Sequence, residues 1–374
     1  MTLMVGARRG FGLFLAIALA IPALSLPFFR LRAVSDAENR PLASAPAWPT
    51  TPAGWTRWPR EVDAFLADHF GFRERLVALG NRTFGRVGKE GRDAVAPPVL
   101  DGGHGRLFLV EGLLSSTGHE LDREGAADYS AFVCDAAQRA RRDGVRLVFA
   151  IAPSPADIYP EDAPEIARPV RSPTNYDLIM TGVSGCGVPA ADLRPALRAA
   201  KGSGNLYRRT DTHWTALGAM IGYNQLVATL GRPGWKIAPS SARWAASANL
   251  TDGDLPRLGA RPPVPETVMF PDRAFPPPSI RRRPLRGFQF KPDRPPYVLE
   301  SDKDGATVVI VGDSFTQHFF PPYFAPFVHR VVWVHQEDCR FDWNIVRSLR
   351  PDYLVLMPTE RYARCPGKGR PQNY

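Results

Sequence analysis

The chain has 374 residues, of which 44% are hydrophobic, and its formal net charge is +10. This size fits one large domain with additions, or two domains. Because 41 arginines outnumber six lysines, the charge indicates either a solvated basic surface or attraction to an anionic polymer or membrane. No zinc-finger, RNP or basic-zipper pattern occurs, which argues against a nucleic-acid partner.

An apolar segment lies near the N-terminus. Arg8 and Arg9 precede residues 10–29, a run long enough to span a bilayer as a helix. The arginines favour a cytoplasmic position for residues 1–9. We expect an uncleaved transmembrane signal anchor over 10–29, with a cleaved signal peptide or a buried core helix as alternatives. Either of the first two places the rest of the chain outside the cytoplasm.

Residues 30–59 are rich in Pro, Ala and Trp and are predicted to form an extended tether. The main domain is predicted over 60–365, followed by a polar tail over 366–374. Alternating helical and strand patterns in this domain predict an α/β fold with a parallel sheet. The expected elements are helices over 60–87 (broken near Gly71), 129–143, 192–200, 216–230 and 344–349, a hairpin over 99–109, and strands over 145–151, 306–311, 327–334 and 353–357.

Residues 256–298 are crowded with proline and include Arg281, Arg282 and Arg283. Long segments of this kind are uncommon inside compact domains. We expect an irregular excursion, which is either a lid, a partner-binding loop or a poorly ordered insertion.

The four cysteines show no metal-type spacing, and no metal constellation stands out among the seven histidines. No metal site is therefore predicted. Outside the cytoplasm, two disulfides are expected, and proximity in the chain favours Cys339 with Cys365, which leaves Cys134 with Cys186. The alternative is that some of these residues are buried thiols.

A candidate nucleophile follows the strongest strand signal in the chain. The β-branched run Thr307–Val311 ends in Gly312-Asp313-Ser314. In α/β sheets, functional sites are built at the carboxyl ends of strands. Ser314 is thus a candidate for attack on an acyl carbonyl, with its own N–H as a first oxyanion donor.

A serine nucleophile needs a base and a group that orients the base. Asp211 and His213 are two residues apart, so on an extended segment their side chains project from one side. We predict that Asp211 orients His213 and that His213 exchanges a proton with Ser314. The alternatives are that Asp211 caps the following helix while His213 only packs, or that His318 is the base.

Further pocket residues are predicted around these three: Asp313, Trp214, Arg361 and Tyr362. The last two follow a strand end next to the predicted nucleophile strand. They are candidates for completing the pocket.

The two motifs together resemble the SGNH-hydrolase-like domain of the alginate O-acetyltransferase family. Similar short motifs run from residue 35 to 365, including Glu38-Asn39-Arg40, Asp68-His69-Phe70-Gly71-Phe72-Arg73, Ile158-Tyr159-Pro160-Glu161, Asp192-Leu193 and Glu360-Arg361-Tyr362. One departure is Pro153-Ser154-Pro155, where the family has Pro-x-Lys. The chain ends soon after Tyr362, so it resembles the anchored J-type member more than the two-domain X-type.

The resemblance implies a flavodoxin-like three-layer α/β/α fold with a circularly permuted motif order, because Asp-x-His precedes Gly-Asp-Ser. It also implies that Ser314, His213 and Asp211 form a catalytic triad that acetylates an exported polysaccharide in the periplasm. No acetyl-CoA or other cofactor is expected. The implied partners are a membrane-bound O-acyltransferase that delivers the acetyl group, the inner membrane and the polysaccharide acceptor.

The same triad serves other functions. A carbohydrate esterase or deacetylase would use water in place of the sugar hydroxyl. A catalytically inert scaffold of a secretion complex would use the arginines to hold an acidic polymer. A peptidoglycan or lipid acyl-transfer protein is a third alternative.

Overall fold

The structure is a computed structural model that describes residues 34–35, 40–69, 99–170, 173–241, 244–271, 279–288, 294–337 and 339–365. Two compact units are present, one of residues 1–98, 257–262 and 374, the other of 99–256 and 263–373. The predicted segments 1–9, 10–29 and 366–374 lie outside the described residues. Within the described part, no helix combines the length and apolar character that crossing a membrane requires.

The first unit contains a short strand pair and one long helix. Strands β1 (Val34–Ser35) and β2 (Arg40–Pro41) pair antiparallel, and α2 spans Pro52–His69. The helix therefore begins within the predicted tether, so residues 52–59 are helical and not extended. Proline suits the first turn of a helix, because its fixed φ is helical and its missing N–H would be unpaired there.

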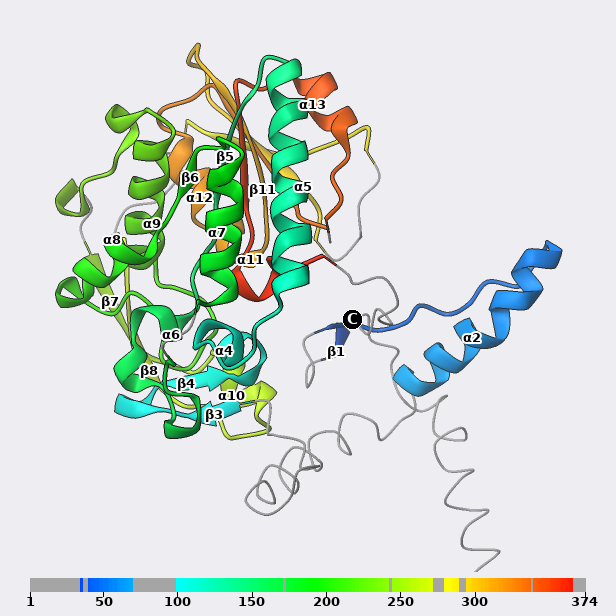
Figure 1. Cartoon of the computed structure of the whole chain (residues 1–374), viewed down its shortest axis with the longest axis horizontal. Helices are drawn as coiled ribbons and strands as arrows, with labels where there is room; N and C mark the ends of the chain where they lie inside the picture. The colour runs from blue at the N-terminus through cyan, green and yellow to red at the C-terminus, as the bar shows by residue number, and fades with distance from the viewer. Residues whose placement is uncertain are drawn as a thin grey trace, which may run out of the picture. The chain divides into compact units, whose positions relative to one another are not determined.

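The second unit is built on a seven-stranded sheet with the order β6-β5-β13-β11-β12-β10-β9. Strands β6, β5 and β11 of this sheet are labelled in Figure 1. The first five strands in this order run parallel, and β10 and β9 continue the sheet antiparallel. The bounds are β5 Arg146–Ala150, β6 Ala190–Ala191, β9 Arg281–Pro284, β10 Tyr297–Glu300, β11 Thr307–Gly312, β12 Arg330–His335 and β13 Tyr353–Met357. The predicted parallel α/β sheet is confirmed.

The connectivity explains the permuted motif order. If the parallel strands are numbered from β11 onward (β11, β12, β13, then β5 and β6), their order across the sheet becomes 2-1-3-4-5. This is the flavodoxin-like order. The strand that precedes Ser314 is therefore first in the fold, although two parallel strands precede it in the chain.

Two hydrophobic cores fill the two faces of the sheet, which makes three layers. Val308 and Ile310 of β11 belong to one core, and Val309 and Val311 belong to the other. Burial on both faces is why this strand is continuously apolar instead of alternating. Helices α8 (Arg194–Ala199), α9 (Ala216–Thr229) and α12 (Phe320–Phe324) cover the first face, and α5 (Arg123–Arg142), α7 (Asn175–Gly185) and α13 (Trp343–Leu349) cover the second (Figure 1).

Several helices begin directly after a residue whose side chain caps the helix N-terminus. Helix α5 starts before the predicted residue 129, because the Asp122 carboxylate accepts the Gly125 N–H at 2.9 Å. Helix α7 was missed, although Thr174 and Asp177 form a capping box at its start. The remaining short helices are α4 Val110–Ser116, α6 Pro155–Ile158, α10 Asp254–Leu258 and α11 Ser314–Gln317, with 3₁₀ turns at Gly103–Gly105, Pro160–Asp162, Glu165–Ala167, Lys201–Ser203, Pro233–Trp235, Pro239–Ser241 and Glu360–Tyr362.

The proline-crowded segment is more regular than predicted. Strand β8 (Glu266–Pro271) pairs with β7 (Trp244–Leu250), and the arginine run forms the edge strand β9. An edge position suits this segment, because proline is tolerated where no ladder hydrogen bond is required. The predicted hairpin is also present, as β3 (Val99–Asp101) paired with β4 (Leu107–Leu109).

Two disulfides join neighbouring elements of the second unit. Cys134 of α5 is bonded to Cys186 at the end of α7, and Cys339 is bonded to Cys365. Helices α5 and α7, which the first disulfide joins, cover the second face of the sheet. Cys339 and Cys365 pack against the core on that same face.

Candidate active site

Ser314 lies directly after the carboxyl end of β11, as the first residue of α11. Gly312 allows this sharp transition. A Cβ at Gly312 would collide with Thr316 Oγ1 and would lie 2.8 Å from the Met357 carbonyl oxygen. Only glycine therefore permits β11, β13 and α11 to approach this closely.

Asp313 holds the turn that carries Ser314 in place. Its side chain is fully buried, and its Oδ1 accepts the Phe315 N–H at 3.0 Å. Its Oδ2 accepts the Thr359 N–H at 2.6 Å, which ties the end of β11 to the segment just beyond β13. Asp313 was predicted to line the pocket, but its burial makes it a support for Ser314.

The structure brings Ser314, His213 and Asp211 together from distant parts of the chain. His213 Nε2 lies 2.8 Å from Ser314 Oγ, and His213 Nδ1 lies 2.7 Å from Asp211 Oδ1. Asp211 Oδ1 also accepts the His213 backbone N–H at 2.9 Å. This continuous chain of hydrogen bonds is the arrangement that nucleophilic serine catalysis requires.

The alternative roles for these residues do not fit the geometry. Helix α9 is capped by Thr215, whose hydroxyl accepts the Gly218 N–H at 3.2 Å, so Asp211 is not the cap. His318 follows α11 and makes no hydrogen bond to Ser314 among the described residues. Burial, with smaller effects of His213 and Arg282, lowers the pKa of His318.

Asp211 is kept ionised by its neighbours. Burial alone would raise the pKa of this carboxyl, but hydrogen bonding and charge attraction from His213, with the Arg208 guanidinium 3.6 Å away, lower it below its usual value. Asp211 Oδ2 also accepts the Asp254 N–H at 3.2 Å. An ionised Asp211 is suited to fix the His213 tautomer and to stabilise the imidazolium.

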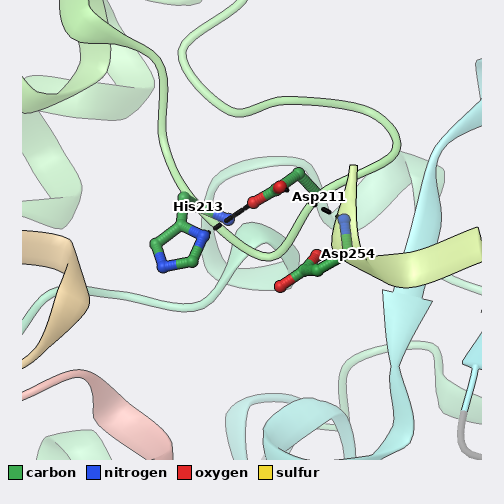
Figure 2. Close-up of side chains that lie close together, drawn as sticks. All are labelled: Asp211, His213 and Asp254. Carbon is green, nitrogen blue, oxygen red and sulfur yellow. Dashed lines mark hydrogen bonds and ion pairs between the residues drawn. The ribbon is translucent and has the colours of Figure 1, made fainter. Parts of the chain in front are cut away.

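Asp254, which sequence analysis missed, lies beside this pair (Figure 2). Its two oxygens accept from the backbone N–H and the hydroxyl of Thr212, at 2.8 and 2.6 Å. Burial and the neighbouring Asp211 raise the pKa of Asp254. Asp211, His213 and Asp254 each have a potential metal-ligand atom within 4.8 Å of the others, but hydrogen bonds already engage the carboxylates. The cluster thus holds His213 in position.

Trp214 also acts as a support and does not line an open pocket. It is 1% exposed, and its indole N–H donates to the Phe315 carbonyl at 3.0 Å. Its ring stacks on Phe320, with centroids 5.5 Å apart. Trp214 therefore fixes the His213 segment against the helices that follow Ser314.

Of the four predicted pocket residues, Arg361 and Tyr362 are the two that are partly exposed. The Arg361 guanidinium lies 5.6 Å from the Phe315 ring centroid, and the His213 ring lies 4.9 Å from the same centroid. Arg361 Nε is buried without a hydrogen-bond partner among the described residues. The pKa of Arg361 is raised, because Tyr362, Asp313 and Glu111 outweigh the lowering effect of burial.

Glu266 of β8 was also missed, and it organises the loop that carries Asp211. Glu266 Oε1 accepts from Arg208 Nε at 2.7 Å and from the Thr210 hydroxyl at 2.6 Å, and its Oε2 accepts the Arg209 N–H at 2.9 Å. No local pattern marks Glu266 in the sequence. Its role follows from the pairing of β8 with β7.

Comparisons with known proteins find a matching family and several similar chains. Residues 99–344 match the family described as "SGNH hydrolase-like domain, acetyltransferase AlgX". The chain is 30% identical over 177 residues to "Probable alginate O-acetylase AlgJ" of Azotobacter vinelandii, covering 47% of this chain and 42% of that protein. It is 31% identical over 222 residues to the protein of the same name from Pseudomonas fluorescens, covering 59% and 51%. The chain thus spans about half the length of these relatives.

The fold is similar to a solved structure of Bacillus cereus PatB1, at 14% identity and a TM-score of 0.53 over 72% of this chain and 98% of that one. That likeness bears on the fold alone. The family match covers the Asp211 loop, the β11 strand and Ser314, which are the parts that form the hydrogen-bonded chain. The chain therefore belongs to the family of SGNH hydrolase-like acetyltransferase domains typified by AlgX, within the wider alginate O-acetyltransferase family.

Proposed function

We propose that this protein is an O-acetyltransferase that moves an acetyl group through Ser314 onto hydroxyls of an exported, alginate-like polysaccharide. The observation that carries the proposal is the hydrogen-bonded chain from Ser314 through His213 to Asp211 at the carboxyl end of β11. Family membership supports acetyl transfer as the reaction.

In the first step, Ser314 Oγ attacks the carbonyl carbon of the acetyl donor while its proton passes to His213 Nε2. The tetrahedral intermediate then breaks its bond to the donor's leaving oxygen, which takes the proton from His213. An acetyl ester on Ser314 results. Base catalysis of this kind contributes on the order of 10² to 10⁴-fold.

In the second step, the acceptor is a sugar hydroxyl. It gives its proton to His213 and attacks the acetyl carbonyl, and Ser314 leaves with the proton that His213 returns. Asp211 keeps its negative charge throughout and stabilises the imidazolium in both halves of the reaction.

The developing oxyanion needs donors. The Ser314 N–H starts α11 and makes no backbone hydrogen bond among the described residues, whereas the next three N–H groups all bond to Asp313. We assign it as the first donor. Arg361 is the candidate for the second, because its cation lies beside the Phe315 ring that His213 also contacts.

Arg282 of the edge strand supports an anionic acceptor. Its guanidinium lies 3.9 Å from the Tyr297 ring centroid, and the Tyr297 hydroxyl donates to the Gln317 carbonyl at the end of α11. The charge of Arg282 contributes to the lowered pKa of His318, and the charge of His213 contributes to it as well. An exposed cation thus lies near the nucleophile's helix, where a carboxylated sugar would be attracted.

We further propose that the protein works in the periplasm, held at the inner membrane by residues 10–29, or soluble there after cleavage. A membrane-bound O-acyltransferase is the proposed source of the acetyl group. The apolar run and the two arginines before it support this placement.

The test is acetylation by the purified full chain, supplied with p-nitrophenyl acetate and oligoalginate. Mass spectrometry should detect acetyl on Ser314 and on the sugar, and Ser314→Ala should abolish both. Ser348→Ala, at an exposed serine of α13, is the matched control and should leave both unchanged.

Other outcomes would separate the alternatives. Free acetate without acetylated sugar would contradict a transferase and indicate an esterase. Unchanged polymer acetylation in cells that carry Ser314→Ala would indicate an inert scaffold. Acetylation of peptidoglycan or lipid in place of exopolysaccharide would change the substrate class.

A further inference from the structure

Two buried carboxyl groups lie side by side behind the nucleophile's turn. Asp157 of α6 is 5% exposed, and Glu360, which begins the turn after β13, is 6% exposed. The Ser154 N–H donates to both, at 2.9 Å to Asp157 Oδ2 and 3.0 Å to Glu360 Oε2. Because one N–H serves both oxygens, the two carboxyl groups must be close neighbours.

Two ionised carboxylates that are buried side by side would repel each other strongly. The state in which the two groups share one proton is therefore favoured. Each carboxyl group affects the pKa of the other, and with one proton between them one group could donate a hydrogen bond to its neighbour. Glu360 Oε1 is buried and has no hydrogen-bond partner among the described residues. Burial first, and then the charge of Asp157, raise the pKa of Glu360 well above its usual value.

The charged and titratable groups that face the pair keep their charge state near neutral pH. Burial raises the pKa of Tyr176 and of Tyr207 well above the usual tyrosine value, so both stay neutral. Arginines stay charged. Asp192, which acts on Tyr176, has a lowered pKa and stays ionised. The groups that interact with the pair are Arg194 and Arg198 of α8, Tyr176 of α7 and Tyr207. Asp192 acts on Tyr176, and Tyr159 and Arg106 act on Tyr207.

The pair is connected to the nucleophile through one short segment. The Glu360 N–H donates to the Ala152 carbonyl at 3.0 Å, which fixes the end of β13 against the end of β5. The preceding residue, Thr359, donates its N–H to Asp313 Oδ2. The following residue, Arg361, lies over the Phe315 ring. A shift of Glu360 would therefore move the groups that hold Ser314.

We propose that Asp157 and Glu360 share a single proton and together act as positioning residues, which lock residues 359–361 against the turn that carries Ser314. Neither residue touches the reacting atoms in this proposal. With its proton in place the pair carries one negative charge. Loss of the proton would force the carboxylates apart and loosen the support of Asp313.

Glu360→Gln is the decisive variant, because the amide donates to Asp157 permanently and cannot lose a proton. In the wild type, Glu360 binds its proton more tightly folded than unfolded, so the pair's stabilisation is full below about pH 4.3 and is lost as the pH rises toward the raised pKa. The equilibrium constant for unfolding can be measured in urea between about pH 5 and 8. Each unit of rising pH should increase the wild-type constant by up to tenfold through this pair. The variant should lack that contribution.

Acylation of Ser314 by p-nitrophenyl acetate gives a second measurement, and this part rests on the proposed function. Glu360→Gln should keep the wild-type rate at neutral pH within about threefold, and Asp157→Asn should do the same, because each keeps one hydrogen bond and one charge. Glu360→Ala should lower kcat by roughly tenfold or more, since it leaves Asp157 unpaired.

Two results would overturn the proposal. One is an unfolding constant with the same pH dependence in the wild type and in Glu360→Gln. The other is a loss of acylation in Glu360→Gln as large as in Glu360→Ala. If instead no variant or wild-type chain acylates Ser314, while the pH difference in unfolding is observed, the shared proton stands and the proposed function fails.

Discussion

The nucleophile stretch and the proline-crowded segment serve the same site by opposite means. The stretch from β11 into α11 is buried, and neighbouring residues fix it: Gly312 permits the turn and Asp313 caps it. The described parts of the proline-crowded segment instead include the peripheral strands β8 and β9. It contributes single side chains, Glu266 beneath the Asp211 loop and Arg282 beside α11.

The two regions differ in how accurately their side chains must be positioned. A reacting serine must be held to within a fraction of an ångström, which strand ends and caps achieve. A group that steers a polymer or braces a loop tolerates more freedom and can be placed by an edge strand. Substitutions in the first region should therefore affect the chemistry most, and those in the second should affect loop order and acceptor binding.

The largest effect is expected from Asp211→Asn. The amide preserves size but no longer stabilises the imidazolium or enforces the tautomer that presents Nε2 to Ser314. Acylation by an activated acetyl ester should fall by about 10³ to 10⁴-fold, by analogy with serine triads in general. Stopped-flow release of p-nitrophenol measures it.

The control for that substitution is Asp135→Asn, at an exposed carboxylate that pairs with Arg139 within α5. Its rate should match the wild type. A loss of less than tenfold in Asp211→Asn would mean that Asp211 only shapes the loop.

A smaller effect is expected from Glu266→Gln in the proline-crowded segment. The substitution weakens charge-assisted hydrogen bonds to Arg208 and Thr210, and such bonds contribute about 1.5–3 kcal/mol each. The acylation rate should fall roughly tenfold, because the Asp211 loop loses order. Glu300→Gln on β10, which alters the pair that Glu300 makes with Arg330 of β12, is the matched control. Equal rates in the two variants would show that β8 does not brace the site.

The smallest effect is expected from Arg282→Ala. One partly solvated charge contributes about 1 kcal/mol, so affinity for an acidic oligosaccharide should weaken roughly fivefold at low salt. The difference should shrink at high salt, because added ions screen the attraction. Arg281→Ala serves as control, since Arg281 pairs with Asp302. An equal loss with a neutral oligosaccharide would contradict an electrostatic role.

Local patterns predicted most of the parallel sheet and its main helices. Strand β13 was predicted with its observed bounds, and α9 differs by one residue at its end. Such elements are predictable because continuous apolar runs and helical periodicity directly reflect burial. The strand at the sheet edge was not predicted, because β9 is an exposed arginine run whose extended form depends on pairing with β10. Intrinsic strand preference is weak there, and tertiary context decides.

By itself, the sequence determined the strand that ends in Gly312-Asp313-Ser314 and the closeness of Asp211 to His213, because adjacent residues fix both. Only the tertiary structure decided that His213 Nε2 meets Ser314 Oγ, that Asp254 and Glu266 hold the segment around Asp211 and His213, and that Asp157 lies beside Glu360. The hydrogen bonds behind these contacts join residues from 42 positions apart (Thr212 with Asp254) to 206 positions apart (Ser154 with Glu360). No local pattern encodes such a meeting, since it arises only when the parallel strands align their carboxyl ends at one edge of the sheet.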